Sequence, residues 1–395
     1  MTERLYEEQS YAVTFDASVA NAEYDGDKTK VVLTRTLFFP EEGGQSADRG
    51  TLNGLPVLDV QLQNGEPVHT VAGLLNPGDG VKGSLDWDFR FRNMQMHSGE
   101  HVFSGLVHTL FGYRNVGFHL SENSATMDYS GKLTEDDIHM LERRANAVIA
   151  ENHAIRAWYP TAEELSKLDY RSKKELDGPI RLVEIEGVDL CACCVPHVRS
   201  TAEIGCLKIT AFENYKGGVR LHYLCGLRAM EHYYDCLTSL TEVGRMLSVK
   251  PEAVCEAVDK LKKEAKELTF RVTAAERRVT AMELKLRYLS DGGTNEGAML
   301  EKAPLVFLKG DAGILRYAMD ELRKYYSGTC AIFCGEDGQG YRYLVECAGG
   351  GIGALQAVLR TELAARGGGS DISVSGSVKA SMEQIRTIMN GYGID

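Results

Sequence analysis

Two pairs of potential metal ligands share one spacing in this sequence. His97 and His101 lie four residues apart, and Cys193 and His197 repeat that spacing later in the chain. Side chains four residues apart on a helix point to the same face, so the two histidines can converge on one ion. Three imidazoles and a thiolate suit zinc, whereas magnesium and calcium prefer oxygen ligands. These four residues therefore predict a site for one zinc ion per chain.

A different cysteine could supply the thiolate, and the role of the zinc ion is open. Cys191 and Cys194 flank Cys193, but only Cys193 keeps the four-residue relation to His197. A structural zinc has four protein ligands, whereas a catalytic zinc keeps one position open for water or substrate. The spacing alone is compatible with both roles.

The histidine helix also fits a different enzyme class. Residues 97–101 match the His-x-x-Glu-His signature of inverted zinc metallopeptidases, in which Glu100 would be the general base. The third ligand would then be a distant carboxylate, such as Glu175 or Asp177. This interpretation leaves the Cys-x-x-x-His pair unexplained, so it ranks second.

The spacing of apolar residues indicates which elements carry these ligands. It becomes helical from Phe91 to Phe111, which places the histidine pair on a helix. Arg181 to Ile185 is predicted to be a strand leading into the cysteine loop, and Cys206 to Phe212 the strand that follows it. We therefore expect an α+β zinc-binding domain over residues 91–227.

Residues 1–90 are predicted to form a separate β-rich domain. The β-prone runs Tyr11–Phe15, Lys30–Thr36 and Val57–Leu62 are separated by turns rich in Gly, Asn and Asp. Several short strands with such turns are typical of a barrel or sandwich. We expect a small N-terminal β-barrel.

The segment 228–290 differs in kind, because it carries a heptad pattern. Apolar residues from Val254 to Leu289 alternate spacings of four and three, and a shorter seam runs from Met230 to Leu247. Pro251 lies where a second helix would begin. The pattern predicts a helical coiled-coil arm, either as an internal two-helix hairpin or as a dimerising coiled coil.

Residues 291–395 return to alternating strands and helices, which predicts an α/β domain. Two glycine clusters, Gly349–Gly351 and Gly367–Gly369, mark this domain. Neither carries the Lys-Ser/Thr or the spacing of a nucleotide-binding fingerprint. We interpret them as helix caps or sites of close packing.

Composition bounds the possible functions. A length of 395 residues suggests two or three domains. The net charge of −12 argues against tight non-specific nucleic-acid binding, although a local basic patch could hold a specific RNA. Arginines such as Arg90 and Arg220 are interpreted as solvated surface charges. The sequence shows no signal peptide and no membrane-spanning apolar run, so we expect a cytoplasmic protein with reduced cysteines.

A glutamine-bearing loop connects the motifs to a known family. It follows a strand that ends near Thr36 and presents Gln45 among turn-forming residues. With this loop, the chain resembles the editing domain of alanyl-tRNA synthetases and the long form of the AlaX trans-editing proteins. The matching pieces are the loop Phe39-Pro40-Glu41-Glu42-Gly43-Gly44-Gln45, the His97/His101 helix, the Cys193/His197 pair followed by Thr201–Gly205, and the turn Lys216–Arg220. The arm and the Gly-rich terminal segment look like a DHH-associated domain, so the resemblance covers nearly the whole chain.

The resemblance implies a zinc-dependent hydrolase that deacylates mischarged tRNA(Ala) in trans, chiefly Ser-tRNA(Ala) and also Gly-tRNA(Ala). Zinc would polarise the ester carbonyl or activate a water. Gln45 matches the family residue near the ester, Thr36 matches the residue that senses the serine hydroxyl, and Glu100 is a candidate general base. A homodimer formed through the C-terminal region is expected. The non-catalytic alternative is a tRNA-binding protein with structural zinc.

The chain departs from the family pattern at two places. Glu42 replaces the first of three glycines that usually precede the glutamine. Cys194-Val195-Pro196 replaces a Gly-rich segment with a threonine before the histidine, and proline fixes φ and removes a backbone donor. Both departures flank residues assigned to the site.

Overall fold

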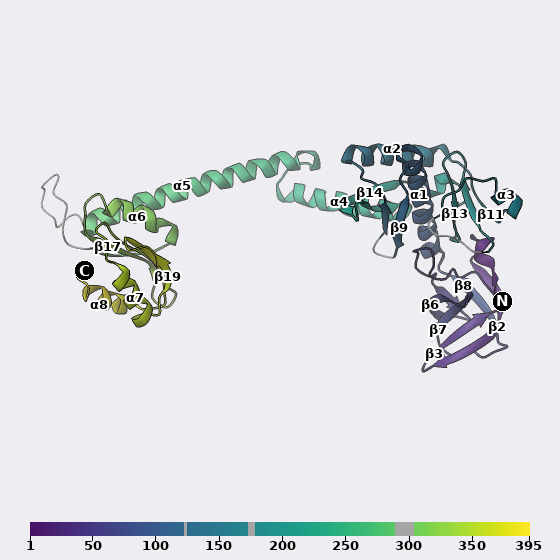
Figure 1. The fold of residues 1–395 in the computed structure, drawn as a ribbon, viewed down its shortest axis with the longest axis horizontal. Helices are drawn as coiled ribbons and strands as arrows, with labels where there is room; N and C mark the ends of the chain where they lie inside the picture. The colour runs from purple at the N-terminus through teal and green to yellow at the C-terminus, as the bar shows by residue number, and fades with distance from the viewer. Residues whose placement is uncertain (122–124, 173–177, 289–303) are drawn as a thin grey trace. The chain divides into compact units, whose positions relative to one another are not determined.

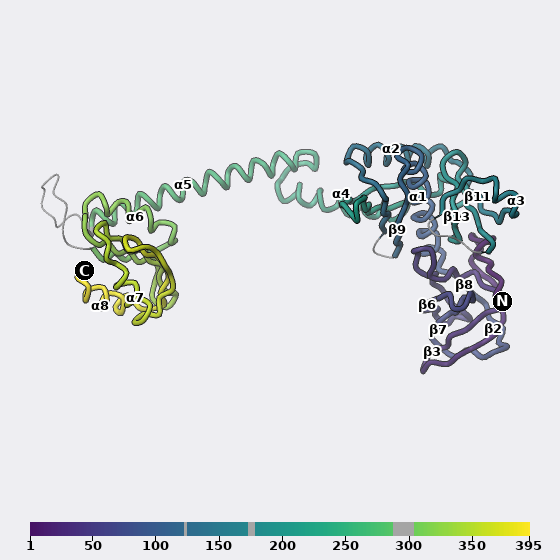
Figure 2. Tube along the Cα trace, viewed as in Figure 1, coloured from purple at the N-terminus to yellow at the C-terminus, as the bar shows by residue number. Residues whose placement is uncertain are grey.

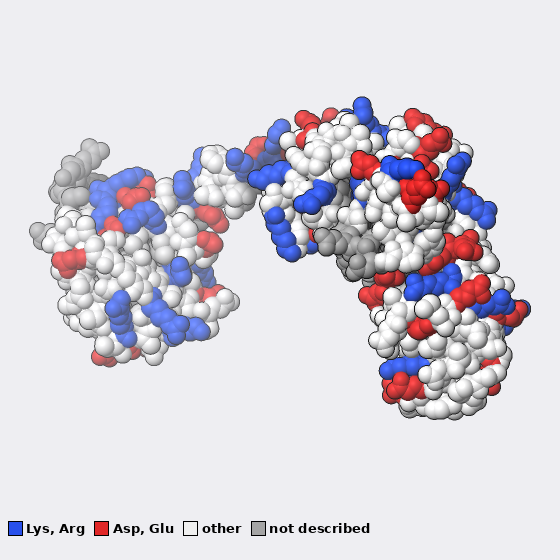
Figure 3. All heavy atoms as spheres, turned by 45° about the vertical axis from the view of Figure 1, so that its right-hand side comes forward, with Lys and Arg blue, Asp and Glu red and all other residues white. Residues whose placement is uncertain are grey.

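The computed structural model describes residues 1–121, 125–172, 178–288 and 304–395 (Figure 1). It divides into two compact units, Met1–Glu242 and Val243–Asp395, which are described separately. Both contain helices and strands, which confirms the expected α+β class. None of the helices in the described ranges is long and apolar enough to cross a membrane. Figure 3 shows acidic and basic side chains interspersed on the drawn face of each unit.

The first unit begins with a closed six-stranded barrel. Its strands alternate buried inward residues and more exposed outward residues, as in β3, where Thr29, Val31 and Leu33 are buried. The interior also holds Phe15, Val60 and Val71. In the order of pairing, the strands are β2 (Thr14–Asp25), β3 (Lys28–Leu33), β7 (Glu66–Ala72), β6 (Leu55–Gln63), β5 (Gly50–Leu52) and β8 (Gly80–Leu85).

The barrel leads directly into the long helix α1 (Trp87–Phe111), as Figure 2 traces. Asp86 caps its first turn by accepting a hydrogen bond from the Phe89 amide, and Gly112 ends it at φ 67°. The predicted helix thus begins four residues earlier than expected, at Trp87. Sixteen of its residues are buried, because other elements pack around it on several sides.

Two further sheets and a second helix surround α1. The larger sheet has the order β14 (Leu207–Tyr215), β15 (Gly218–Cys225), β10 (Ala125–Tyr129) and β9 (Asn115–Leu120). The smaller one joins β11 (Ile155–Trp158), β12 (Leu182–Ile185) and β13 (Asp189–Ala192). Helix α2 (Glu135–Glu151) packs on α1, and α3 (Ala162–Leu165) is a single short turn. The strand β13 was not expected, and it is the element that leads into the cysteine loop.

Short elements complete the first unit. The strands β1 (Glu3–Arg4) and β4 (Arg35–Thr36) pair in parallel, so the N-terminus lies beside the strand before the glutamine loop. The 3-10 turns are η1 (Leu5–Glu7) and η2 (Thr201–Ile204). Helix α4 (Gly226–Met246) begins in this unit, and its last residues belong to the second unit.

The second unit starts within the predicted arm, at the last residues of α4. Pro251 opens the turn η3 (Pro251–Ala253), which leads into α5 (Val254–Tyr288) as expected. Along α5 several seam residues are exposed, including Leu261 at 53%, Leu268 at 56% and Met282 at 67%. Leu284 is instead buried against the following domain. The last residue of the predicted seam, Leu289, lies outside the described residues.

The rest of the second unit is one five-stranded sheet with helices on both faces. Its order is β16 (Leu305–Leu308), β17 (Thr329–Glu336), β18 (Gly340–Cys347), β20 (Ser373–Val378) and β19 (Arg366–Gly369). Leu284 of α5, the turn η4 (Ala312–Ile314) and α6 (Leu315–Leu322) share one apolar cluster, whereas α7 (Gly353–Glu362) and α8 (Met382–Asn390) share the other. Both clusters include residues of the sheet.

The two glycine clusters have different structural reasons. Gly367 and Gly369 lie in β19, where a side chain would collide with the backbone of β20, so they are sites of close packing. The cluster before α7 is closed by Asp371, whose carboxylate accepts hydrogen bonds from the amides of Gly351 at 2.9 Å and Gly353 at 3.4 Å. These amides are therefore already hydrogen-bonded to Asp371 and are not available to an anionic ligand.

Candidate metal centre

The structure brings the four predicted ligands together in the first unit. The ligand atoms of His97, His101, Cys193 and His197 all lie within 4.8 Å of one another. Cys193 Sγ is 3.4 Å from the Nε2 atoms of both His97 and His197. The three histidines are at most 5% exposed. This group of nitrogen and sulfur donors could hold a metal ion, and its chemistry suits zinc.

The charges on these four side chains favour metal binding. Burial acts to raise the pKa of the Cys193 thiol, but the three imidazoles outweigh it and hold this pKa well below 9. Burial lowers the pKa of His197 to about 3. Burial also acts to lower the pKa of His101, but Asp189 and Cys193 raise it to about 9. A thiolate thus faces one imidazolium, whose proton a metal ion would replace.

The neighbouring cysteines behave differently from Cys193. Burial raises the pKa of Cys191 to about 12. Burial, together with Cys193 and Glu42, also raises the pKa of Cys194. Cys191 does belong to a second possible ligand group, with His101 and Asp189. Because both side chains remain protonated thiols, the geometry and the charge favour Cys193 as the thiolate.

An outer shell of hydrogen bonds orients two of the imidazoles. Asp189 Oδ2 lies 3.0 Å from His101 Nδ1, and Ser98 Oγ lies 2.9 Å from His197 Nδ1. Arg171 in turn donates to both oxygens of Asp189, at 2.6 and 2.7 Å. Such partners fix the tautomer and orientation of metal-binding histidines. None of these three residues was predicted from the sequence. Ser98 lies next to His97 and Asp189 lies near the cysteines, whereas Arg171 has no such local signal.

Asp189→Asn should lower the affinity for the metal by about 10- to 100-fold, because His101 loses its charged partner. Competition with a chromophoric zinc chelator measures this change. Asp128→Asn is the matched control, since Asp128 forms a similar pair with Arg220, with both contacts at 2.7 Å, in another sheet. Equal losses of metal affinity in the two variants would show that the contact between Asp189 and His101 does not support metal binding.

The glutamine loop lies beside this centre. Leu120 of β9 donates its amide to Gly44 O at 2.7 Å and accepts from the Ser46 amide at 3.1 Å. On the same strand, the ring of Phe118 lies 4.8 Å from the ring of His97. Gln45 is fully buried, and neither atom of its side-chain amide has a hydrogen-bond partner among the described residues. Buried amides are nearly always paired, so Gln45 is a candidate for contact with a ligand.

Thr36 is buried at the barrel instead. Its Oγ1 lies 2.8 Å from Nε2 of His69 and accepts a hydrogen bond from the Phe38 amide. Burial lowers the pKa of His69 to about 4, so this imidazole is neutral near pH 7. These contacts engage the Thr36 hydroxyl within the protein, and its predicted role toward serine stays a prediction.

Glu100 is held in a buried polar cluster. One carboxylate oxygen accepts from Ser104 Oγ at 2.6 Å and from Asn115 Nδ2 at 2.5 Å. The other lies 3.8 Å from His101 Nε2. The carboxylates considered as a third ligand for a peptidase site, Glu175 and Asp177, lie outside the described residues. The role of Glu100 as a general base also stays a prediction.

A pocket of about 680 Å³ opens at the centre. His97, His101 and Cys193 contribute to its lining, together with Glu42 and Arg181. Further lining residues include Arg4, Glu7, Gly43, Gly44, Phe118, Tyr159 and Cys194. A small ligand can therefore reach the ligand group.

The two departures from the family pattern meet at this pocket. Val195 is fully buried and packs with Tyr6 and Phe39, so it fills apolar space between the N-terminal turn and the glutamine loop. Gly43 has φ 63°, and a side chain on it would approach Val195 within 3.1 Å. Arg181 donates to the carbonyls of Cys193 and Val195 at 3.0 and 3.1 Å. The unusual segment is therefore a fixed part of the site wall.

Comparisons with known proteins indicate the family of this chain. The family described as the threonyl and alanyl tRNA synthetase second additional domain matches residues 180–222, which include Cys193 and His197. Alanyl-tRNA editing protein AlaX-L of Pyrococcus horikoshii is 28% identical over 98% of this chain and 96% of its own. Alanyl-tRNA editing protein Aarsd1 of Danio rerio is 34% identical over 65% of this chain and 67% of its own. An alanine–tRNA ligase of Ignicoccus hospitalis is 32% identical over 74% of this chain, which spans 33% of the ligase.

These relatives and the site define an enzyme class. The protein is an aminoacyl-tRNA hydrolase, which cleaves a carboxylic ester. A peptidase is thereby set aside, as the unexplained Cys-x-x-x-His pair already suggested. The chain belongs to the family of AlaX-type alanyl-tRNA editing proteins.

Proposed function

We propose that the protein deacylates tRNA(Ala) mischarged with serine, and also with glycine, in trans and with zinc at the His97/His101/Cys193/His197 centre. The observation that carries the proposal is the convergence of this centre with the glutamine loop at one pocket. The relatives are named as alanyl-tRNA editing proteins, which supports mischarged tRNA(Ala) as the class of substrate.

A separate hydrolytic site is needed because an alanine-binding site cannot fully exclude glycine and serine. An active site sized for alanine rejects glycine weakly, because a missing methylene changes binding by only about 1–3 kcal/mol, and it also rejects an added hydroxyl poorly. A second site must therefore remove the errors.

Residues of this chain supply binding and orientation. Zinc, when bound, would act as a Lewis acid on the ester or activate a water for attack. Gln45, which is fully buried beside the pocket-lining Gly44, is the proposed contact for the ester group, because its side-chain amide has no hydrogen-bond partner among the described residues. Arg181 keeps the wall of the pocket fixed through the cysteine-loop carbonyls. Thr36 and Glu100 remain the proposed serine sensor and general base.

A deacylation assay tests the function. Purified protein with zinc is incubated with tRNA(Ala) carrying serine, glycine or alanine, and His101→Ala serves as the inactive control. We expect rapid loss of the seryl ester and little loss of the alanyl ester. Ser-tRNA(Ala) that stays as stable as in buffer would overturn the proposal, and tight tRNA binding without hydrolysis would indicate a binding protein.

We further propose four domains: a barrel (1–90), a zinc-binding editing domain (91–227), a helical arm (228–290) and a DHH-associated-like domain (291–395). The closed barrel supports the first, the two sheets around α1 support the second, and the helices α4 and α5 support the third. The sheet with helices on both faces supports the fourth.

The protein should be a homodimer through its C-terminal region, with a mass twice the 43.5 kDa of the chain by light scattering. Exposed apolar residues along α5 support self-association, because such a surface is costly in water. Leu268→Glu with Val272→Glu tests whether the seam takes part. A monomeric wild-type protein would contradict the prediction, whereas a dimeric variant would assign the contact to residues 303–395 alone.

A further inference from the structure

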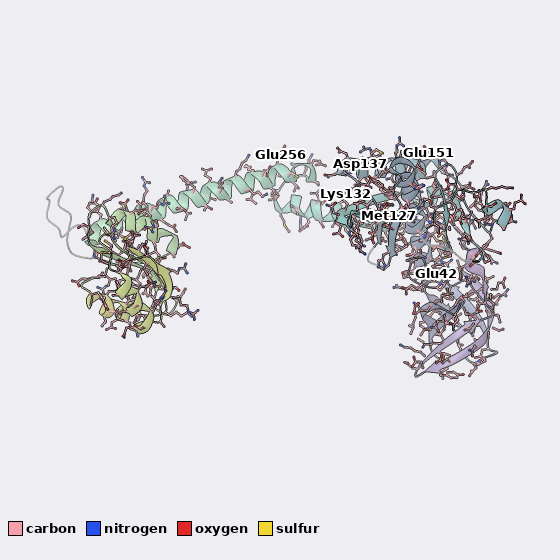
Figure 4. All side chains as sticks on the ribbon, viewed as in Figure 1. Glu42, Met127, Lys132, Asp137, Glu151 and Glu256 are labelled. Carbon is pink, nitrogen blue, oxygen red and sulfur yellow. The ribbon has the colours of Figure 1, made fainter. Side chains whose placement is uncertain are left out.

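Glu42 places a carboxylate in the pocket where the family pattern has glycine. Its backbone is fixed by a tight turn, since Glu42 and Gln45 exchange amide hydrogen bonds of 3.2 and 3.0 Å. Its half-buried side chain lines the same pocket as His97, His101 and Cys193. Figure 4 labels Glu42 between the barrel strands and α1. The carboxylate is therefore presented to whatever occupies the pocket.

The other charged side chains of this lining are engaged within the protein. Arg4 pairs with Glu7 at 3.5 Å and donates to Gly65 O at 2.8 Å. Glu7 also accepts from the Tyr159 hydroxyl at 2.7 Å, and Arg181 donates to backbone carbonyls. Within the described part of the chain, Glu42 forms no ion pair within 4.0 Å. The charge of Arg4 acts on it at longer range, and the nearby thiol of Cys194 is a weak donor. Glu42 is thus the charged group of the pocket that still lacks a strong partner.

The substrate brings one group that fits this carboxylate. An aminoacyl ester carries an α-amino group next to the reacting carbonyl. Peptide α-amino groups have pKa values of about 7.7–8.0, and the ester lowers this value somewhat, so a substantial share of these groups is cationic near pH 7. A zinc ion with one thiolate and neutral imidazoles would leave net positive charge nearby, which disfavours an ammonium group. A carboxylate on the same pocket offsets this repulsion. We propose, on the basis of the proposed function, that Glu42 binds the α-ammonium group of the aminoacyl ester and makes the enzyme selective for substrates with a free α-amine.

This selectivity has a functional meaning. Esters whose α-nitrogen is acylated, as in peptidyl-tRNA, lack the cation and would lose the contact. Glu42 would then restrict hydrolysis to aminoacyl-tRNA and spare chains in synthesis. It is a specificity-determining residue, and it is not required for the metal centre.

Binding and turnover of matched substrates test the proposal. The probes are 3′-deoxy-3′-(L-serylamino)adenosine and its N-acetyl form for calorimetry, and Ser-tRNA(Ala) and N-acetyl-Ser-tRNA(Ala) for hydrolysis. Wild type should prefer the free amine by about 10-fold or more in both readouts, as expected for a charge-assisted hydrogen bond. Glu42→Gln should reduce the preference to within about twofold by acting on the free-amine probes alone.

Glu41→Gln is the control, because Glu41 is exposed, accepts from Gln61 Nε2 at 2.9 Å and is not among the lining residues. It should keep the wild-type preference. Hydrolysis of Ser-tRNA(Ala) with an unchanged preference in Glu42→Gln, or equal losses on both probes, overturns the assignment of Glu42 while the proposed function stands. Wild-type protein that neither binds the probes nor hydrolyses Ser-tRNA(Ala) overturns the proposed function and this assignment together.

Discussion

Cys193→Ala should empty the metal centre and lower deacylation by more than about 100-fold, because loss of a direct ligand exceeds the effect of losing an outer-shell partner. The Cys193 Sγ atom lies 3.4 Å from two of the three imidazoles, so the change removes the anionic member of the group. Metal content by mass spectrometry of the purified protein and single-turnover deacylation measure the two effects.

The neighbouring cysteines provide internal controls. Cys194→Ala and Cys191→Ala should keep one metal ion per chain, since both thiols are held protonated by burial. Metal retained in Cys193→Ala and lost in either of the other variants would assign the thiolate elsewhere. That result would assign the thiolate to Cys191 or Cys194, while the three histidines would stay the other ligands.

Arg90→Met should destabilise the first unit by about 3–5 kcal/mol, because it leaves a buried carboxylate without its partner. Arg90 and Asp48 are 0% and 2% exposed. Arg90 Nε lies 2.9 Å from Asp48 Oδ1, and its Nη2 donates to the carbonyl of Leu37 at 2.6 Å. Asp48 Oδ2 also accepts from the Phe39 amide at 2.6 Å, so the pair connects α1 to both ends of the glutamine loop.

Urea unfolding followed by tryptophan fluorescence measures this loss. Both tryptophans, Trp87 and Trp158, lie in the first unit, so the signal reports that unit alone. Arg92→Met is the control, because Arg92 pairs with Asp88 at 2.9 Å and with Glu231 at 2.6 Å near the surface. Such pairs contribute about 0–1 kcal/mol. Similar losses for the two variants would mean that the buried pair adds no more than a surface one.

The four candidate metal ligands could be found from the sequence because their spacing is local. Each ligand pair lies four residues apart, so spacing alone reports the pairing. The partners that support them are distant: Asp189 is 88 residues from His101, and Asp48 is 42 residues from Arg90. The interpretation of Arg90 as a solvated surface charge was wrong for this reason, since an arginine is buried only where a distant carboxylate meets it.

In the fold, too, features set by neighbouring residues could be predicted, whereas features set by distant contacts could not. Pro251 and the heptad pattern predicted the start of α5, because both act within a helix. The strand β19 was missed, because glycine has low strand propensity, and it is required here by the close approach of β20. The short strand β13 was also missed, and it is stabilised by pairing with β12.

The burial of α1 on several sides has a consequence for biosynthesis. The ribosome makes this helix before most of its partners, which include η2 and β15, ending at Cys225. Until that residue emerges, apolar side chains such as Met94, Phe103 and Val107 lack part of the packing that buries them in the finished fold, and exposed apolar surface of this kind favours aggregation. His97 and His101 are likewise made before Cys193 and His197, so the candidate ligand group is complete only late in the synthesis of the first unit.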